Sequence, residues 1–189
     1  MSAKTVLMLV AAALSWTMVR AVPAQEAAVF DPVLTKEFQR RVQVVLDLRK
    51  KLQSGMPKLP QEATTAQMDA NQRQLEAALR AARLDARQGD IFTPEIQALV
   101  RTTIVAVIAR PDGKQIKSSV LDENPMGIRV RVNDRYPDKI PLATMPPQLL
   151  KALPLMPEGF EYRFVGDNLV LLDPIAHLIL DFVPRALPV

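Results

Sequence analysis

A change of hydrophobic period near residue 127 constrains the fold of this chain more than any other feature. Before it, apolar residues recur every third or fourth position, as they do on one face of an α-helix. After it, apolar and polar residues alternate, which is typical of half-buried β-strands. This order predicts an α+β fold with about three amphipathic N-terminal helices, followed by a small antiparallel β-meander.

The meander is predicted from residues 160–183. Alternating aromatic residues in FEYRF lead into Gly166-Asp167-Asn168, a tight-turn signal, and a second turn is expected at Asp173-Pro174. The last strand would place on one face Leu178, Leu180 and Phe182, and on the other His177, Ile179, Asp181 and Val183. A further half-buried strand is predicted over Gly127–Asn133, where GIRVRVN alternates.

The helices are predicted from their capping residues. The first is expected to open at Asp31-Pro32, because aspartate caps a helix and proline fits its first turn, and to end at Gly55. The second is expected over about residues 61–88, and the third opens at Thr93-Pro94 in the same way. Two shorter helices are expected over residues 114–124 and near Pro147.

Residues 1–24 have the order of a secretory signal peptide. Lys4 precedes the apolar run Val6–Val19, and Val22 and Ala24 occupy the small-residue positions before an expected cleavage after Ala24. The run is shorter than the ~20 residues of a membrane span, so a retained N-terminal anchor is the alternative. The chain has no cysteine, which excludes a lipoprotein anchor. We expect a periplasmic or secreted protein with no membrane span after cleavage.

The expected mature chain has three parts and little net charge. The parts are an N-terminal helix and linker (25–60), a helical region (61–125) and a C-terminal β-meander module (126–189). Loss of Lys4 and Arg20 lowers the net charge of +4 by two units, which gives no argument for a nucleic-acid partner. The lack of cysteine also excludes disulfides and thiolate catalysis.

His177 is the only histidine in the chain. The pattern places it at the exit of the second turn, where Asp173 is the carboxylate expected to reach it. Asp181 lies four residues along the same strand, ~13 Å away. A histidine with one carboxylate offers too few ligands for a structural metal site, which needs about four. We therefore expect a turn histidine bonded to backbone or water, with no metal site.

Catalytic motifs are missing from the sequence. It contains no glycine-rich phosphate loop, no G-x-S-x-G elbow and no H-E-x-x-H. Paired carboxylates remain formally available for acid–base chemistry, namely Asp122 with Glu123 and Asp173 with Asp181. Acidic residues are mostly solvated, so we expect a protein that is not an enzyme and has no cofactor.

A basic and aromatic patch is the least ordinary surface feature that the sequence predicts. Its residues would be Arg129, Arg131, Arg135, Tyr136 and Arg163. The patch is interpreted either as a binding surface for an acidic partner or anionic envelope polymer, or as an ordinary solvated sheet face. Together with Asp173 and His177, these five residues are the binding candidates.

The run LPLMPEGFEYRFVGDNLVLLDPIAHLILDFV resembles the C-terminal segment of RcnB-like periplasmic proteins. The likeness rests on P-x-G-x-x-Y-x-x-V-G-x-x-L-V-L followed by a return strand. The wider run from RVNDRYP through PLATMPPQLLKALP resembles uncharacterised exported bacterial proteins with the same hairpin. The resemblance implies a periplasmic location and a small β-module. RcnB-like proteins are linked to nickel and cobalt homeostasis, but a single histidine does not carry that function over.

Two functions are therefore expected. The first is a small non-enzymatic exported protein that acts through protein–protein contacts, either with an envelope protein or by self-association. The alternative is a metal-ion or envelope-anion binding module of the RcnB-like type.

Overall fold

A computed structural model describes residues 31–122, 124, 127–138 and 144–188. Its helices are α1 (Pro32–Ser54), α2 (Thr65–Ala82), α3 (Pro94–Ile108), α4 (Gly113–Asp122) and α5 (Pro147–Ala152). Its strands are β1 (Glu161–Val165), β2 (Asn168–Asp173) and β3 (Leu178–Val183). The predicted α+β class with a C-terminal meander is confirmed. The predicted signal peptide lies outside the described residues.

The predicted starts of the first and third helices are confirmed, while α2 begins a few residues later than predicted. The Asp31 carboxylate accepts a hydrogen bond from the Val33 N–H at 2.7 Å, and the Thr93 hydroxyl accepts one from the Ile96 N–H. Helix α2 begins after a capping box between Thr64 and Gln67. It ends at Ala82, earlier than predicted, where Arg83 bonds to Asn133.

The three strands form an antiparallel sheet in the order β1-β2-β3. Gly166 has a φ of 61° and forms the tight turn between β1 and β2 with Asp167. Tyr162 lies opposite Leu171 in this hairpin, and Phe164 lies opposite Leu169. These four side chains share one face of the sheet.

A β-bulge in β3 overturns the predicted faces of that strand. Leu171 lies opposite Asp181 while Leu172 lies opposite Ile179, so Leu180 is an extra residue. The bulge reverses the alternation beyond it. Val183 therefore joins the main core, while Phe182 packs on the other face of the sheet with Ile179. The prediction that Phe182 shares a face with Leu180 was wrong.

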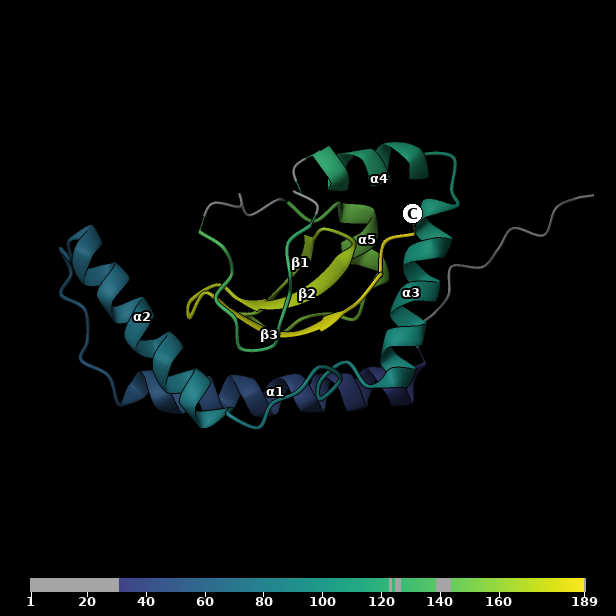
Figure 1. The fold of residues 1–189 in the computed structure, drawn as a ribbon. Coiled ribbons are helices and arrows are strands. Elements are labelled where there is room, and N and C mark those ends of the chain that lie inside the picture. Colours follow the sequence, from purple (N-terminus) through teal and green to yellow (C-terminus); the bar gives the residue numbers. More distant parts are fainter. Residues whose placement is uncertain (1–30, 123, 125–126, 139–143, 189) are drawn as a thin grey trace, which may run out of the picture.

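One face of the sheet packs on the helices. In Figure 1, α1 runs along the lower side of the molecule, with α2 and α3 rising near its two ends. Phe38 of α1 stacks on Phe92, with ring centroids 5.3 Å apart, and on Tyr162 of β1 at 6.3 Å. The N-terminal helix and the C-terminal strands therefore share one apolar core.

The other face of the sheet is covered by an irregular segment, residues 128–136. Tyr136 is buried there against β-strand side chains, and Ile128 and Val130 pack beside it. The strand predicted over Gly127–Asn133 was wrong, because this segment begins to pair with β3 only at Asn133. The Asn133 N–H donates to the Ile179 carbonyl, and the Tyr136 N–H donates to the His177 carbonyl, both at 2.9 Å.

Candidate functional site

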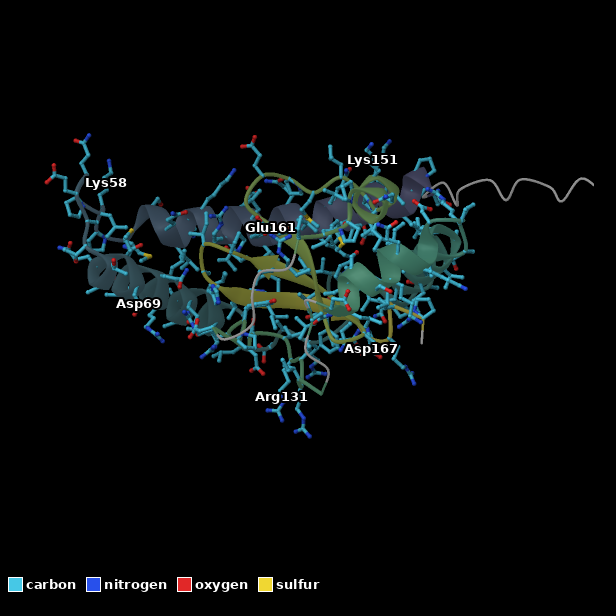
Figure 2. All side chains as sticks on the ribbon, turned by 90° about the horizontal axis from the view of Figure 1, so that it is seen from above. Lys58, Asp69, Arg131, Lys151, Glu161 and Asp167 are labelled. Carbon is cyan, nitrogen blue, oxygen red and sulfur yellow. The ribbon has the colours of Figure 1, made fainter. Side chains whose placement is uncertain are left out.

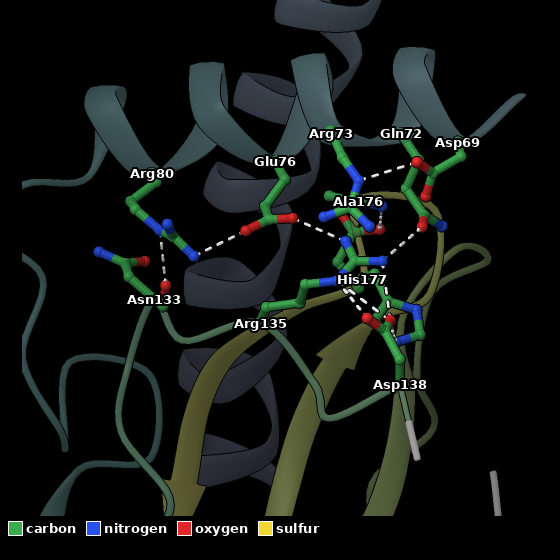
Figure 3. A network of polar contacts seen from close by, with 11 residues as sticks. Asp69, Gln72, Arg73, Glu76, Arg80, Asn133, Arg135, Asp138, Ala176 and His177 are labelled. Carbon is green, nitrogen blue, oxygen red and sulfur yellow. Dashed lines mark hydrogen bonds and ion pairs between the residues drawn. The ribbon is translucent and has the colours of Figure 1, made fainter. Parts of the chain in front are cut away.

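Arg135, a predicted binding residue, is held in ion pairs at the contact between α2 and residues 133–138. We call this contact the α2 seam, and Figure 3 shows it from close by. Glu76 lies 2.7 Å from both Arg80 and Arg135. Arg135 also reaches Asp138 at 2.9 Å. Its guanidinium therefore joins parts of the fold and is not free to bind an external anion.

The α2 seam also explains where α2 ends. The Arg83 guanidinium turns inward and donates to the Asn133 side chain at 3.0 Å and to the Leu180 carbonyl at 2.9 Å. The Asn133 amide donates back to the Arg83 carbonyl at 2.6 Å. Asn133 has a φ of 63°, a left-handed conformation that asparagine tolerates better than most residues. The side chain and the backbone carbonyl of Arg83 therefore bond to distant parts of the chain, and the helix ends before this residue.

His177 lies in the turn between β2 and β3 with a φ of 55°. Its ring meets Tyr136 edge-on, with centroids 5.7 Å apart, and its Nε2 lies 3.5 Å from Asp138. Asp138 is therefore its carboxylate neighbour, and the predicted neighbour Asp173 was wrong. Burial, together with the nearby Arg135, lowers the pKa of His177 below its usual value, so the ring is neutral at pH 7.

Asp173 instead fastens α1 to the sheet. One carboxylate oxygen accepts hydrogen bonds from the Ile175 and Ala176 N–H groups at 2.9 and 3.0 Å, which shapes the turn. The other lies 3.6 Å from Nε of Arg49, and both side chains are buried. Burial raises the pKa of Asp173, while these hydrogen bonds and Arg49 oppose the rise.

Gly159 makes room for Arg49. The Arg49 guanidinium lies over the Phe160 ring, 5.6 Å from its centroid. A Cβ at Gly159 would come within 2.5 Å of the guanidinium, and its φ of 100° already disfavours other residues. Sequence reasoning missed Arg49, because the sequence does not distinguish this buried arginine from the exposed Lys50 and Lys51 that follow it.

Asp181 is buried and holds the loop between α2 and α3. Its carboxylate accepts hydrogen bonds from the backbone N–H groups of Gly89 at 3.0 Å and of Ile91, Phe92 and Phe182 at 2.8 Å. The sequence analysis missed this role, although a carboxylate inside the apolar strand HLILDFV is a signal that could have indicated a buried partner. Asp173 and Asp181 therefore serve separate structural contacts and do not form an acid–base pair.

The predicted basic and aromatic patch is divided by the fold. Arg129 and Arg131 are exposed, and Figure 2 shows Arg131 projecting outward. Neither guanidinium has an ion pair or hydrogen bond with another described residue. Tyr136 is buried, and Arg163 forms an ion pair with Glu161. Only the first two arginines therefore present free positive charge.

A pocket of about 360 Å³ lies beside β1. Its lining includes Phe160, Glu161, Tyr162 and Arg163, together with Leu150 and Leu155. These two leucines are 51% and 83% exposed. An apolar pocket bordered by a charged pair is a feature that the sequence did not indicate.

Metal-binding and membrane-spanning features were searched in the part of the chain that the structure describes. No group of three or more histidine, aspartate or glutamate side chains there is placed to hold a metal ion. No helix of that part is long and apolar enough to span a bilayer.

Comparisons with known proteins do not assign this chain to a family. No protein-family model, curated protein or solved structure matches it. The resemblance of its hairpin to RcnB-like proteins stays a prediction.

The lowered pKa of His177 predicts a pH-dependent contribution to stability. Below the unfolded pKa of about 6.5, the unfolded chain takes up the proton more readily than the folded one, so stability falls as the pH falls. His177→Asn removes this titration and keeps a residue that tolerates positive φ. We expect the loss of unfolding free energy between about pH 7 and pH 5 to be smaller in the variant, measured by urea denaturation. Equal losses of unfolding free energy in the wild type and the variant would show that His177 does not cause this pH dependence.

Proposed function

We propose that this chain is an exported, non-enzymatic protein that acts through contacts with another protein of the cell envelope. The observation that supports this most directly is how its reactive groups are used. Asp173 and Asp181 are buried and bonded to backbone amides, and His177 is packed against Tyr136. These groups maintain the fold, which leaves the surface to carry the function.

Two surface features suit a protein partner. Arg129 and Arg131 present exposed positive charge, which attracts an acidic surface. The pocket beside β1 has exposed Leu155 at its border, and an apolar centre with a charged rim is the usual composition of an interface. The export part of the proposal rests on the order of charged, apolar and small residues in 1–24.

Site-specific photo-cross-linking in the cells that produce the protein tests this proposal. A photoreactive residue at Leu155 is compared with one at Leu84, which is 79% exposed and lies outside the pocket. We expect a discrete adduct with one envelope protein from position 155 and none from position 84.

A monomeric, catalytically active mature protein that gives no adduct from either position would contradict the proposed function. If tripolyphosphate then stabilised the wild type but not an Arg129→Gln, Arg131→Gln variant, the anion-binding alternative would take its place. That alternative is favoured by the two exposed guanidinium groups alone.

A further inference from the structure

The pocket beside β1 combines buried and exposed apolar side chains. Met145, Phe160 and Tyr162 line it and are buried. Leu150 and Leu155 line it as well, and both are exposed. Apolar surface therefore continues from the interior of the molecule to the opening of the pocket. A ligand in this pocket would remove that surface from water, which is the main source of affinity for apolar molecules.

Contacts within the chain hold the walls of the pocket in place. The Tyr162 hydroxyl donates a hydrogen bond to the Pro154 carbonyl at 3.1 Å, and this bond is buried. It fastens the loop that carries Leu155 to strand β1. Leu149 anchors helix α5, which carries Leu150, in the main core. The pocket therefore forms without a ligand, as most small-molecule sites do.

The charged groups of the lining are already paired with each other. Arg163 forms an ion pair with Glu161, and it also donates to the Tyr162 carbonyl at 3.2 Å. The two charges cancel, so the lining has no net charge. A charged ligand would have to break this ion pair or remain buried without a partner, and both are costly. A neutral ligand leaves the pair intact.

Two methionines line the pocket together with an aromatic ring. They are Met145 and Met156, and the ring belongs to Phe160. A methionine side chain is flexible enough to follow the shape of a ligand, and its sulfur makes favourable contacts with aromatic rings. Aromatic rings also pack favourably on one another. This lining therefore favours an aromatic ligand over other apolar ones.

We propose that the pocket beside β1 binds a small, neutral, aromatic molecule. Its volume of about 360 Å³ lies within the usual range of ligand pockets, about 300 to 1,000 Å³. The ring of the ligand would contact Met145, Met156 and Phe160 and would cover Leu155. This inference goes beyond the proposed function, because it concerns a small molecule and not a protein partner.

Two fluorescent probes with one aromatic skeleton test the proposal. Phenylnaphthylamine is neutral, whereas anilinonaphthalene sulfonate carries a negative charge on the same ring system. We expect the purified mature protein to bind phenylnaphthylamine saturably, with one site per chain. It should bind the sulfonate about tenfold more weakly, because the only arginine of the lining is already paired with Glu161. Fluorescence titration measures both dissociation constants.

Leu155→Asp and Leu84→Asp form a matched pair of variants. Both leucines are exposed, so both variants should keep the fold, which circular dichroism checks. Leu155 lines the pocket, and Leu84 lies outside it. We expect Leu155→Asp to weaken the binding of phenylnaphthylamine about fivefold, because it replaces apolar contact with a charge. Leu84→Asp should leave the dissociation constant unchanged.

The methyl signals of the methionines give a readout by nuclear magnetic resonance that needs no variant. Saturating phenylnaphthylamine should shift the signals of Met145 and Met156, because ring currents act on nearby methyl groups. Met68 is the internal control, since it is 48% exposed and lies outside the pocket. Its signal should stay in place.

Equal affinity for the two probes, or equal weakening by the two aspartate variants, would overturn the proposal. A shift of the Met68 signal without shifts of Met145 and Met156 would overturn it as well. If position 155 captures an envelope protein in cells but phenylnaphthylamine does not bind, the pocket proposal fails while the proposed function stands. Selective binding of phenylnaphthylamine by a protein that gives no adduct in cells would keep the pocket proposal and reject the proposed function.

Discussion

Replacing Asp181 with alanine is expected to lower the free energy of unfolding by about 4 kcal/mol, because it leaves buried backbone N–H groups without an acceptor. The carboxylate accepts from Gly89, Ile91 and Phe92 in one loop and from Phe182 in its own strand. Asp181 is fully buried, so bulk solvent does not compete for these bonds in the native fold. Denaturant unfolding followed by circular dichroism measures the loss.

Asp134→Ala is the matched control for this experiment. Asp134 is exposed, and it supports β3 through its backbone carbonyl, which the substitution keeps. Its effect should stay within about 0.5 kcal/mol, as for most surface changes. A loss below about 1 kcal/mol for Asp181→Ala would show that the loop between α2 and α3 is held by its apolar side chains alone.

Arg49→Met is expected to cost about 3 kcal/mol at pH 7, because it leaves the Asp173 carboxylate buried without its cation. The pKa of Asp173 is already raised by burial and is lowered by Arg49, so the substitution raises it further. A folded pKa above the unfolded value means that stability is lost as the pH rises through the folded pKa. The cost of Arg49→Met should therefore be smaller at about pH 4 than at pH 7.

The double variant Arg49→Met, Asp173→Asn separates the charge from the packing. Asparagine keeps an oxygen that can accept from the Ile175 and Ala176 N–H groups, and it carries no charge. The double variant should be more stable at pH 7 than Arg49→Met alone, with a coupling above about 0.5 kcal/mol in the double-mutant cycle. Independent, additive effects at every pH would mean that the two side chains do not interact.

Features set by neighbouring residues were predictable from the sequence. Asp31 and Thr93 start their helices through bonds to residues two or three positions away. The Gly166-Asp167 turn fixes the register of β1 and β2 in the same local way. Such contacts do not depend on the rest of the fold, so the sequence pattern alone identifies them.

Features set by distant residues were not predictable. The extra residue Leu180 reverses the faces of β3, and a one-residue shift is invisible in an alternating pattern. Helix α2 stops at Ala82 because Arg83 bonds to Asn133, fifty positions away along the chain. His177 lies beside Asp138 instead of Asp173 because residues 133–136 join the outer edge of β3. Each error arises from a partner that the sequence does not place.

The contacts of β3 with residues much earlier in the chain influence how fast this molecule can fold. Asp181 bonds to the loop that contains Gly89, and Arg83 bonds to the Leu180 carbonyl, 97 positions further along. Such separations give a high contact order and slow folding. Until β3 has joined the sheet, the helices form without the residues that hold the loop between α2 and α3 in place.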